Sequence, residues 1–480
     1  MEKSKRQSGS KVAELKEKLQ ASRSEIRSLR YRLSAVEKSR DHQQGKVRVL
    51  RKENKQIRRS ASSSKVGASP ILRHRYDTRI VSLCIALYAF AGCSFRGVKR
   101  VLMCLQMELG LSAADIPGKS SVDNWVQKAG LYQLSTLTTV PEQWGSYCLI
   151  MDESMVVGKE RMMLALGAPA QKTGSNALSF ESVKVLGIGV LPSWKHGDVQ
   201  DFIQKVQEKM GQKAAYVVSD GGASLKKGIH ESGLVRICDV GHEMCKLMEQ
   251  TYKNDPRYEV WIKAVTKVRF QVFMKDTAYL LPPKQRTVAR FTNLSHVVRW
   301  AVAILRAMPG LSKDEQQTYG WLDEHKEVIG VFERAFHLSE SILKILKNDG
   351  LSHQNIEKGL LICQKQAPVV CKKLLDKVVA FLRDEKEKLP KVDTVWHMSS
   401  DVIESLFGKF KHLAASNPLN GVTARVLSLC LFTSGNGSPE NVNNYAQQAL
   451  ESISLSKLAS WKNDYLIDNQ IVRRRKTFKK

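Results

Sequence analysis

The chain has 480 residues, and its 76 lysines and arginines outnumber its 47 aspartates and glutamates, which gives a formal net charge of +29. No apolar run approaches the about 20 residues of a membrane span, and the charged start lacks the apolar core of a secretory signal peptide. The nine cysteines show no repeated spacing, so we expect reduced thiols in an intracellular protein rather than a disulfide scaffold. The positive charge favours a polyanionic partner.

Residues 10–58 are predicted to form a coiled coil. Asn54 falls at an a position of the heptad, which favours one register and a dimer, whereas Arg40 and Gln43 interrupt the seam. We expect a homodimer or a higher homo-oligomer, and the alternative is a long solvated helix. The residues that recur at alternating spacings of three and four are Val12, Leu15, Leu19, Ile26, Leu29, Leu33, Val36, Val47, Leu50 and Ile57.

A second region of helices follows a predicted flexible linker, residues 59–72, whose first part is rich in serine. Residues 79–88 and 95–107 have helical patterns, and a loop leads into a third helix over 120–128, which Ser120 or Ser121 can cap. With Asn124 and Gln127 exposed on that helix, residues 73–140 are similar to a helix-turn-helix DNA-binding domain. The alternative is a plain three-helix packing module. The residues expected to contact DNA are Ser121, Asn124, Gln127 and Lys128.

The next segment reads as alternating strands and helices. Strands are expected over 147–151, 161–169, 183–191, 214–219 and 234–238, with a helix over 198–210 that Gly211 ends and two further helices. Asp152 directly follows the first strand and Asp220 follows the fourth. Gly221 and Gly222 then let the backbone turn sharply and approach a ligand.

An all-helical insertion is expected over 251–395, with helical patterns at 258–273, 288–307, 315–346 and 356–389. Its tryptophans, Trp261, Trp300 and Trp321, are interpreted as core anchors. A minority interpretation lets Trp300 stack on an unpaired base.

A last helix of this core is expected over 401–411, where it carries Glu404 and Lys411. Residues 416–480 form a helical C-terminal region whose basic end, Arg473, Arg474 and Arg475, either contacts phosphate, acts as a localisation signal or is a solvated tail.

Three acidic residues, Asp152, Asp220 and Glu404, thus come from three separate elements. Hard carboxylate oxygens suit Mg²⁺ or Mn²⁺, and two such ions about 3.5–4 Å apart stabilise both the attacking and the leaving oxygen at phosphorus. The alternative makes each aspartate a helix or turn cap and places Glu404 on a solvated face. Glu153 and Asp401 are the neighbours that would replace a wrong assignment.

A histidine motif follows the fifth predicted strand, Asp239-Val240-Gly241-His242. Together with the strand order, the spacing of Glu404 to Lys411 and the pair Arg299-Trp300, it resembles the C/D-x-x-H group of the DDE transposase superfamily. That group includes hAT-like and Mutator-like enzymes and bacterial insertion-sequence relatives. The resemblance covers roughly residues 145–415. The spacing of Cys238, His242 and Cys245, which would share one helical face, also suggests zinc, but no second ligand pair follows.

The resemblance implies an α/β ribonuclease-H-like catalytic core, residues 145–250 and 396–415, interrupted by the helical insertion and preceded by the coiled coil and the helix-turn-helix domain. It implies metal-dependent cleavage and strand transfer on double-stranded DNA, at transposon ends and target, with two Mg²⁺ or Mn²⁺ ions per site. The protein would be DNA-associated, in the cytoplasm or nucleoid of a bacterium or the nucleus of a eukaryote. The alternatives are an inactive transposase-derived DNA-binding protein and a host ribonuclease-H-like nuclease.

Roles for individual residues follow from the same resemblance. His242 would contact the scissile phosphate or orient a carboxylate, unless it is a satisfied core histidine. Asp239, Gly221 and Gly222 would support the catalytic residues without binding the metal ions themselves. The residues expected to contact DNA near the site are Arg299, Trp300 and Lys411.

Deleting residues 1–58 should lower the oligomeric state without unfolding the rest of the chain, because the heptad register lies wholly within that segment. Light scattering on the full and the truncated chain would measure this. An unchanged mass would rule out the coiled coil as a major element of oligomerisation.

Overall fold

The computed structural model describes scattered positions between 20 and 49, and then residues 74–478 except 109, 156–159, 286–289, 391–392, 414–420, 434–438 and 469. The chain divides into two compact units, Met1–Ser69 and Pro70–Lys480. In the first unit the described positions are helical, and the predicted seam residues Ile26, Leu29 and Leu33 are each more than half exposed in the single chain. The predicted linker, Asn54 and the seam residues before 20 lie outside the described residues.

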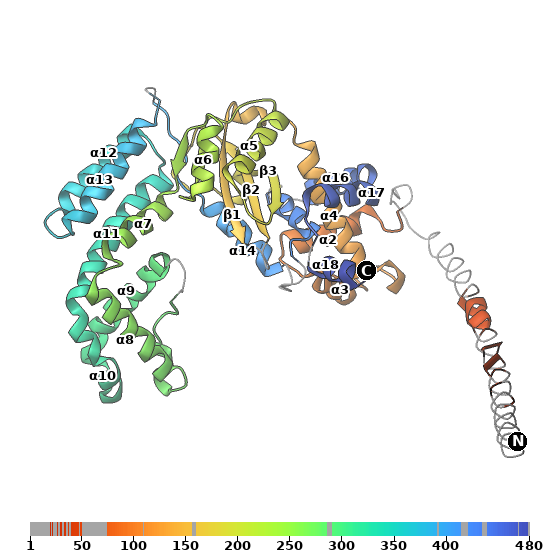
Figure 1. Cartoon of the computed structure of the whole chain (residues 1–480), viewed down its shortest axis with the longest axis horizontal. Coiled ribbons are helices and arrows are strands. Elements are labelled where there is room, and N and C mark those ends of the chain that lie inside the picture. The colour runs from red at the N-terminus through yellow and green to blue at the C-terminus, as the bar shows by residue number, and fades with distance from the viewer. Residues whose placement is uncertain are drawn as a thin grey trace, which may run out of the picture. The chain divides into compact units, whose positions relative to one another are not determined.

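The second unit contains a mixed five-stranded sheet (Figure 1). Its strands are β1 (Tyr147–Met155), β2 (Arg161–Pro169), β3 (Lys184–Leu191), β4 (Val217–Ser219) and β5 (Arg236–Cys238). The order is β3-β2-β1-β4-β5; β1, β2 and β3 are antiparallel, and β4 and β5 run parallel to β1. The five predicted strands are present, but β4 and β5 begin later than the predicted residues 214 and 234, and β1 ends later than predicted. β1 continues to Met155, so Asp152 lies within the strand and not after its end.

Side chains of β1 alternate between two apolar layers, as the period of a strand requires. Leu149 and Met151 belong to the layer formed with α5 (His196–Met210) and α6 (Ala223–Glu231), whereas Cys148 and Ile150 belong to the larger core on the opposite face. Asp152 continues the second series. It therefore points to the face where α14 (Asp401–Leu413) contacts β1.

The N-terminal helices of this unit pack against the C-terminal helices. α2 (Thr78–Ala89) and α4 (Lys119–Thr136) contact α16 (Pro439–Ser452), and α4 also contacts α15 (Ser428–Phe432) and α17 (Leu455–Tyr465). A side chain at Gly130 would clash with the Leu427 carbonyl oxygen, so α4 lies directly on that backbone. Residues 78–136, which include α3 (Phe95–Cys104), thus form one helical layer with the C-terminal region.

Two sequence-based details of α4 are wrong. Gly118 is its N-cap, so neither Ser120 nor Ser121 caps the helix, and the helix extends well past residue 128 to Thr136. The residues beyond 128 include Leu131, which is buried, and Tyr132 and Leu134, which pack on the core.

Between the two parts of the core lies the helical insertion (Figure 1). After α7 (Val240–Tyr252) come α8 (Pro256–Val272), α9 (Arg290–Ala307), α10 (Lys313–Tyr319), α11 (Lys326–Asn348), α12 (His353–Gln366) and α13 (Lys372–Glu387). The predicted helices 315–346 and 356–389 are each divided in two. Trp261 is fully buried and stacks on Phe332 at 5.8 Å, which confirms it as a core anchor.

The chain leaves the core and returns to it at nearly the same place. Leu351 pairs with Trp396, the amide of Lys172 donates to the carbonyl of Val395 at 2.7 Å, and the amide of Val240 donates to the carbonyl of Met398 at 3.0 Å. These contacts bring the start of α14 beside the start of α7. Among the described residues, no helix is both long and apolar enough to span a bilayer.

Candidate active site

Asp152 and Asp220 lie side by side at the centre of the sheet. β1 and β4 are parallel neighbours with Met151 opposite Ser219, so the residue that follows each of these is brought to the same level. The Asp152 carboxylate accepts a hydrogen bond from the Glu153 amide at 2.7 Å, and the Asp220 carboxylate accepts one from the Gly222 amide at 3.1 Å.

Burial, the negative charge of Asp220 and, less, that of Glu404 together raise the pKa of the Asp152 carboxyl to about 7, whereas the hydrogen bond from the Glu153 amide and the charge of His242 oppose this rise. The three predicted acids therefore interact electrostatically. A carboxyl group in this setting stays partly protonated at neutral pH unless positive charge is added nearby.

The third acid, Glu404, lies on α14. Apolar side chains bury the inner face of this helix, at Val402, Ile403, Leu406, Phe407 and Phe410, and Glu404 lies outside that face with its side chain 52% exposed. Its carboxylate lies 3.2 Å from Nε2 of His242. The helix thus brings Glu404 to the histidine of the Asp239-Val240-Gly241-His242 motif.

His242 occupies the first turn of α7, where Asp239 is the N-cap. The Asp239 Oδ1 atom accepts from the His242 amide at 2.7 Å and lies 3.0 Å from the ring Nδ1. The hydrogen bond to Asp239 and the charges of Asp239, Glu404 and Asp220 together raise the pKa of His242 to about 9, although burial opposes this rise. At neutral pH the ring is an imidazolium, and both of its nitrogens donate.

Asp239 also holds the beginning of α14. Its Oδ2 atom accepts from the Ser400 amide at 2.6 Å and from the Ser400 hydroxyl at 2.9 Å. Burial alone would raise the pKa of this carboxyl, but the hydrogen bonds from His242 and Ser400 together with the charge of His242 lower it. A side chain at Gly241 would approach Asp239 Oδ1 to 3.2 Å, so glycine keeps room for this carboxylate.

Sequence reasoning missed two supporting residues, Ser400 and Arg236. The Arg236 guanidinium donates to the Asp220 carbonyl at 2.6 Å and to the Ser219 hydroxyl at 3.0 Å, and so fixes the end of β4. An arginine inside a short buried strand is a signal that was present in the sequence, because such a charge needs partners.

The glycines after Asp220 act differently from the expectation. Gly222 has φ −56° and ψ 132°, which most residues can adopt, so no left-handed turn is present there. Its role is steric: a side chain at Gly222 would lie 3.3 Å from Asp220 Oδ1. A side chain at Gly221 would meet only Lys226, at 3.8 Å or more.

The two acids considered as replacements are engaged elsewhere. Glu153 forms an ion pair with Arg161 at 2.7 Å, and Asp401 forms one with Lys347 on α11. Glu404 also has a cationic partner, His242, so the choice of Glu404 over Asp401 stays a prediction.

The zinc interpretation assumed a shared helical face that does not exist. Cys238 lies on β5, whereas His242 and Cys245 lie on α7. Burial raises the pKa of both thiols to about 11, which disfavours the thiolate that binds zinc.

The residues predicted to contact DNA differ in their exposure. Ser121 and Asn124 are half-buried, and the expected exposure of Gln127 is wrong, because it is buried with its amide donating to Asp123 at 2.7 Å. Lys128 is buried as well, since α4 is covered by α15 and α16. This helix does not present the surface that a recognition helix needs.

Other predicted contacts remain at the surface. Lys411 is exposed on α14, and Arg473, Arg474 and Arg475 are exposed on α18 (Gln470–Phe478). Arg299 is exposed but forms an ion pair with Glu340.

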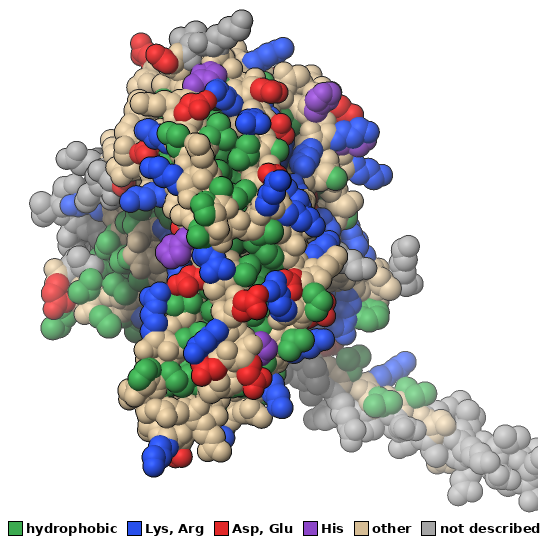
Figure 2. All heavy atoms as spheres, turned by 90° about the vertical axis from the view of Figure 1, so that its left-hand side faces the viewer, with side chains coloured by type: hydrophobic (Ala, Val, Ile, Leu, Met, Phe, Trp, Pro, Cys, Tyr) green, Lys and Arg blue, Asp and Glu red, His purple; other side chains and the backbone are tan. Residues whose placement is uncertain are grey.

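Trp300 and Trp321 are half-buried. The indole of Trp300 donates to the Leu280 carbonyl at 2.9 Å, and both rings pack on the core, so the anchoring interpretation fits. On the face shown in Figure 2, lysine and arginine side chains are spread among acidic and apolar ones rather than gathered in one stripe.

No model of a known protein family matches this chain, and no curated protein is significantly similar to it. Within the described residues, no three histidine, cysteine, aspartate or glutamate side chains are grouped closely enough to hold a metal ion as they stand. The donor set nevertheless suits a hard divalent cation, because carboxylate oxygens predominate and the charge of His242 compensates the Asp152 carboxyl only in part.

Replacing Asp239 with asparagine should lower the pKa of His242 from about 9, because the hydrogen bond that raises it most would be lost. A raised histidine pKa contributes stability that is complete below its ordinary value of 6.5 and disappears as the pH rises through about 9. Asp239→Asn should flatten that pH dependence.

An NMR titration of the imidazole protons would measure the pKa directly. Glu249→Gln, which removes another carboxylate from the same helix, serves as the control and should leave the titration unchanged. A His242 pKa that stayed near 9 in Asp239→Asn would refute the assigned cause.

Proposed function

We propose that this chain is a DDE-type transposase that cleaves and joins DNA strands with the help of divalent metal ions. The observation that carries the proposal is that Asp152 on β1, Asp220 at the end of β4 and Glu404 on α14 lie close together. The charges of Asp220 and Glu404 both act on the Asp152 carboxyl. The strand order β3-β2-β1-β4-β5, with acids on the two central strands, supports a ribonuclease-H-like core.

Asp152, Asp220 and Glu404 would hold two Mg²⁺ or Mn²⁺ ions, which supply positive charge to the attacking and leaving oxygens of the phosphoryl transfer. Asp152 must lose its proton for this purpose, and its raised pKa makes that loss dependent on pH. His242, held as an imidazolium by Asp239, forms an ion pair with Glu404 and would be able to turn toward a phosphate oxygen.

The net charge of +29 favours DNA as the substrate. Two sets of exposed residues suit phosphate contacts: Lys411, which follows Glu404 on α14, and the arginines of α18. The exposed seam of the first unit supports assembly with a second copy, which would let two DNA ends be held together.

One observation favours a second candidate, a DNA-binding protein of transposase descent that no longer cuts. The Glu404 carboxylate lies beside the imidazolium of His242, so protein charge already compensates one of the three acids. In an active site the carboxylates would draw together around the ions, and Glu404 would exchange this partner for a metal.

Asp220→Asn should abolish DNA cleavage while leaving DNA binding nearly intact, because a neutral amide is a poor ligand for Mg²⁺. Cleavage of a supercoiled plasmid and gel-shift binding, both with Mg²⁺, would measure the two effects. Glu153→Gln is the matched control, since that carboxylate faces Arg161. Comparable cleavage by Asp220→Asn and the unmodified protein would defeat the proposal.

Mg²⁺ should raise the unfolding temperature at pH 8 and much less at pH 5. The folded pKa of Asp152 is about 7, above its ordinary 3.8, so without metal its burial costs stability increasingly as the pH rises from about 4 through 7. A bound cation offsets that cost where the carboxyl is ionised. At a free Mg²⁺ concentration one hundred times the dissociation constant, binding stabilises the folded chain by about 2.7 kcal/mol.

Thermal unfolding with and without Mg²⁺ at the two pH values tests this, and Asp152→Asn should remove the effect. If Asp152→Asn responds to Mg²⁺ as the unmodified protein does, the ion binds elsewhere. If neither responds, the second candidate is favoured.

A further inference from the structure

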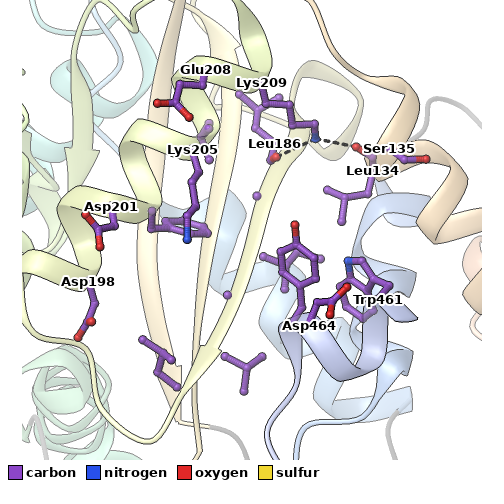
Figure 3. A pocket seen from close by; sticks show the side chains of 18 of the residues that line it. Leu134, Ser135, Leu186, Asp198, Asp201, Lys205, Glu208, Lys209, Trp461 and Asp464 are labelled. Atoms are coloured by element: carbon purple, nitrogen blue, oxygen red, sulfur yellow. Dashed lines mark hydrogen bonds between the residues drawn. The ribbon is translucent and has the colours of Figure 1, made fainter. Parts of the chain in front are cut away.

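A groove of 810 Å³ lies beside β3, at the opposite edge of the sheet from β5 (Figure 3). Asp152, Asp220 and Glu404 do not line it. It is lined by consecutive residues of β3 from Leu186 to Leu191, and no residue of β2 lines it. β3 is the last strand of the described sheet on that side, so the groove follows its outer edge. The N–H and C=O groups of an outer edge are a template for another strand.

One end of this edge is closed. The Lys209 ammonium donates to the carbonyls of Leu186 and Leu134, at 3.0 and 2.6 Å (Figure 3). Leu186 is also the unpaired residue of a bulge, since its neighbours Val185 and Gly187 pair with Leu166 and Ala165. Beyond this point the groove is lined by the stretch from Gly187 to Leu191, in which Gly189 and Leu191 are half-buried and the other three residues are buried.

The walls of the groove combine acids with aromatic rings. Asp198, Asp201 and Lys205 on α5 lie across from Trp461 and Asp464 on α17 (Figure 3). Tyr465, half exposed, stacks on Trp461 at 5.4 Å. Stacked rings beside a carboxylate are a favourable environment for an arginine guanidinium.

The charge of the groove is opposite to that of the whole chain. Four carboxylates line it, those of Asp198, Asp201, Glu208 and Asp464, against the ammoniums of Lys205 and Lys209. Lys209 is committed to main-chain carbonyls. Such a groove repels phosphate and attracts basic side chains, although the chain carries a net charge of +29.

We propose that this groove binds an extended peptide segment rich in arginine, which adds to β3 as a further strand. Main-chain hydrogen bonds to Gly187–Leu191 give affinity, and alternate side chains reach the acids and the Trp461–Tyr465 stack. The partner is thus a protein with a basic, extended segment, and this surface is separate from the carboxylate cluster.

The test uses the full chain and a short fluorescent peptide of alternating arginine and valine. Anisotropy should show binding that weakens with salt. A peptide with proline in place of valine loses the main-chain donors, and one with glutamate in place of arginine loses the charge; both should fail to bind. The double variant Asp201→Arg, Asp464→Arg should weaken binding about tenfold or more.

Glu181→Arg, an exposed charge reversal just before β3 and outside the groove, should bind as the unmodified chain does. Hydrogen exchange on the unmodified chain gives an independent measurement, in which the peptide should protect the amides of residues 187–191. Equal binding of the proline peptide, or no protection of these amides, would overturn the proposal.

Two further outcomes would assign the groove to other occupants. Protection of the same amides by a DNA oligonucleotide that displaces the peptide would make it a nucleic-acid site. Protection that grows with protein concentration alone would make it a contact between copies of this chain. Either result overturns the proposal.

Discussion

The arrangement of the candidate site depends on one buried carboxylate, that of Asp239. Its two oxygens accept from the first turn of α7 through His242 and from the beginning of α14 through Ser400. Two helices that are separated along the chain by the whole insertion are thereby joined through one side chain, beside the ion pair of His242 with Glu404. Breaking a buried charged network by removing one partner costs about 3–5 kcal/mol, so this joint is a strong constraint on where His242 and Glu404 lie.

The pKa values of Asp152 and His242 are both raised, with opposite effects on charge: the carboxyl is held toward its neutral form and the imidazole in its charged form. On the sheet side, burial and like charge hold Asp152 near the point of protonation, whereas on the helix side His242 is held protonated. The imidazolium lies between Asp239 and Glu404, and the central aspartates have no comparable partner. A divalent cation would therefore have its largest effect beside β1 and β4, where it would stabilise the ionised form of Asp152.

Much of the core could be predicted from local pattern. The strands were found because continuous apolar runs end at polar or glycine residues, and helix α5 was found because its apolar residues recur at helical spacing and Gly211 ends it in the left-handed conformation, φ 64°. The exact extent of β1 was missed, because Asp152 and Glu153 interrupt its apolar pattern while its pairing with β2 continues to Met155. The candidate acids could be named from sequence, since each followed or occupied a recognisable element.

What could not be predicted depends on contacts between distant segments. α4 has the polar composition of a surface helix, yet Gln127 and Lys128 are buried because the C-terminal helices cover it. No local signal in residues 119–136 indicates that cover. Likewise the role of Ser400 depends on the return of the chain beside α7, which is set by the insertion and by the pairing of Leu351 with Trp396.

The place of α14 so late in the chain has a consequence for synthesis. Asp152 and Asp220 leave the ribosome long before Glu404 and Ser400, and at about 5–20 residues per second the insertion alone takes on the order of ten seconds or more to emerge. Until then Asp239 lacks its Ser400 partner, and α4 lacks the helices that cover it. A nascent or truncated chain therefore holds two of the three acids in an unfinished setting, so the complete cluster forms only after the insertion and α14 have been synthesised.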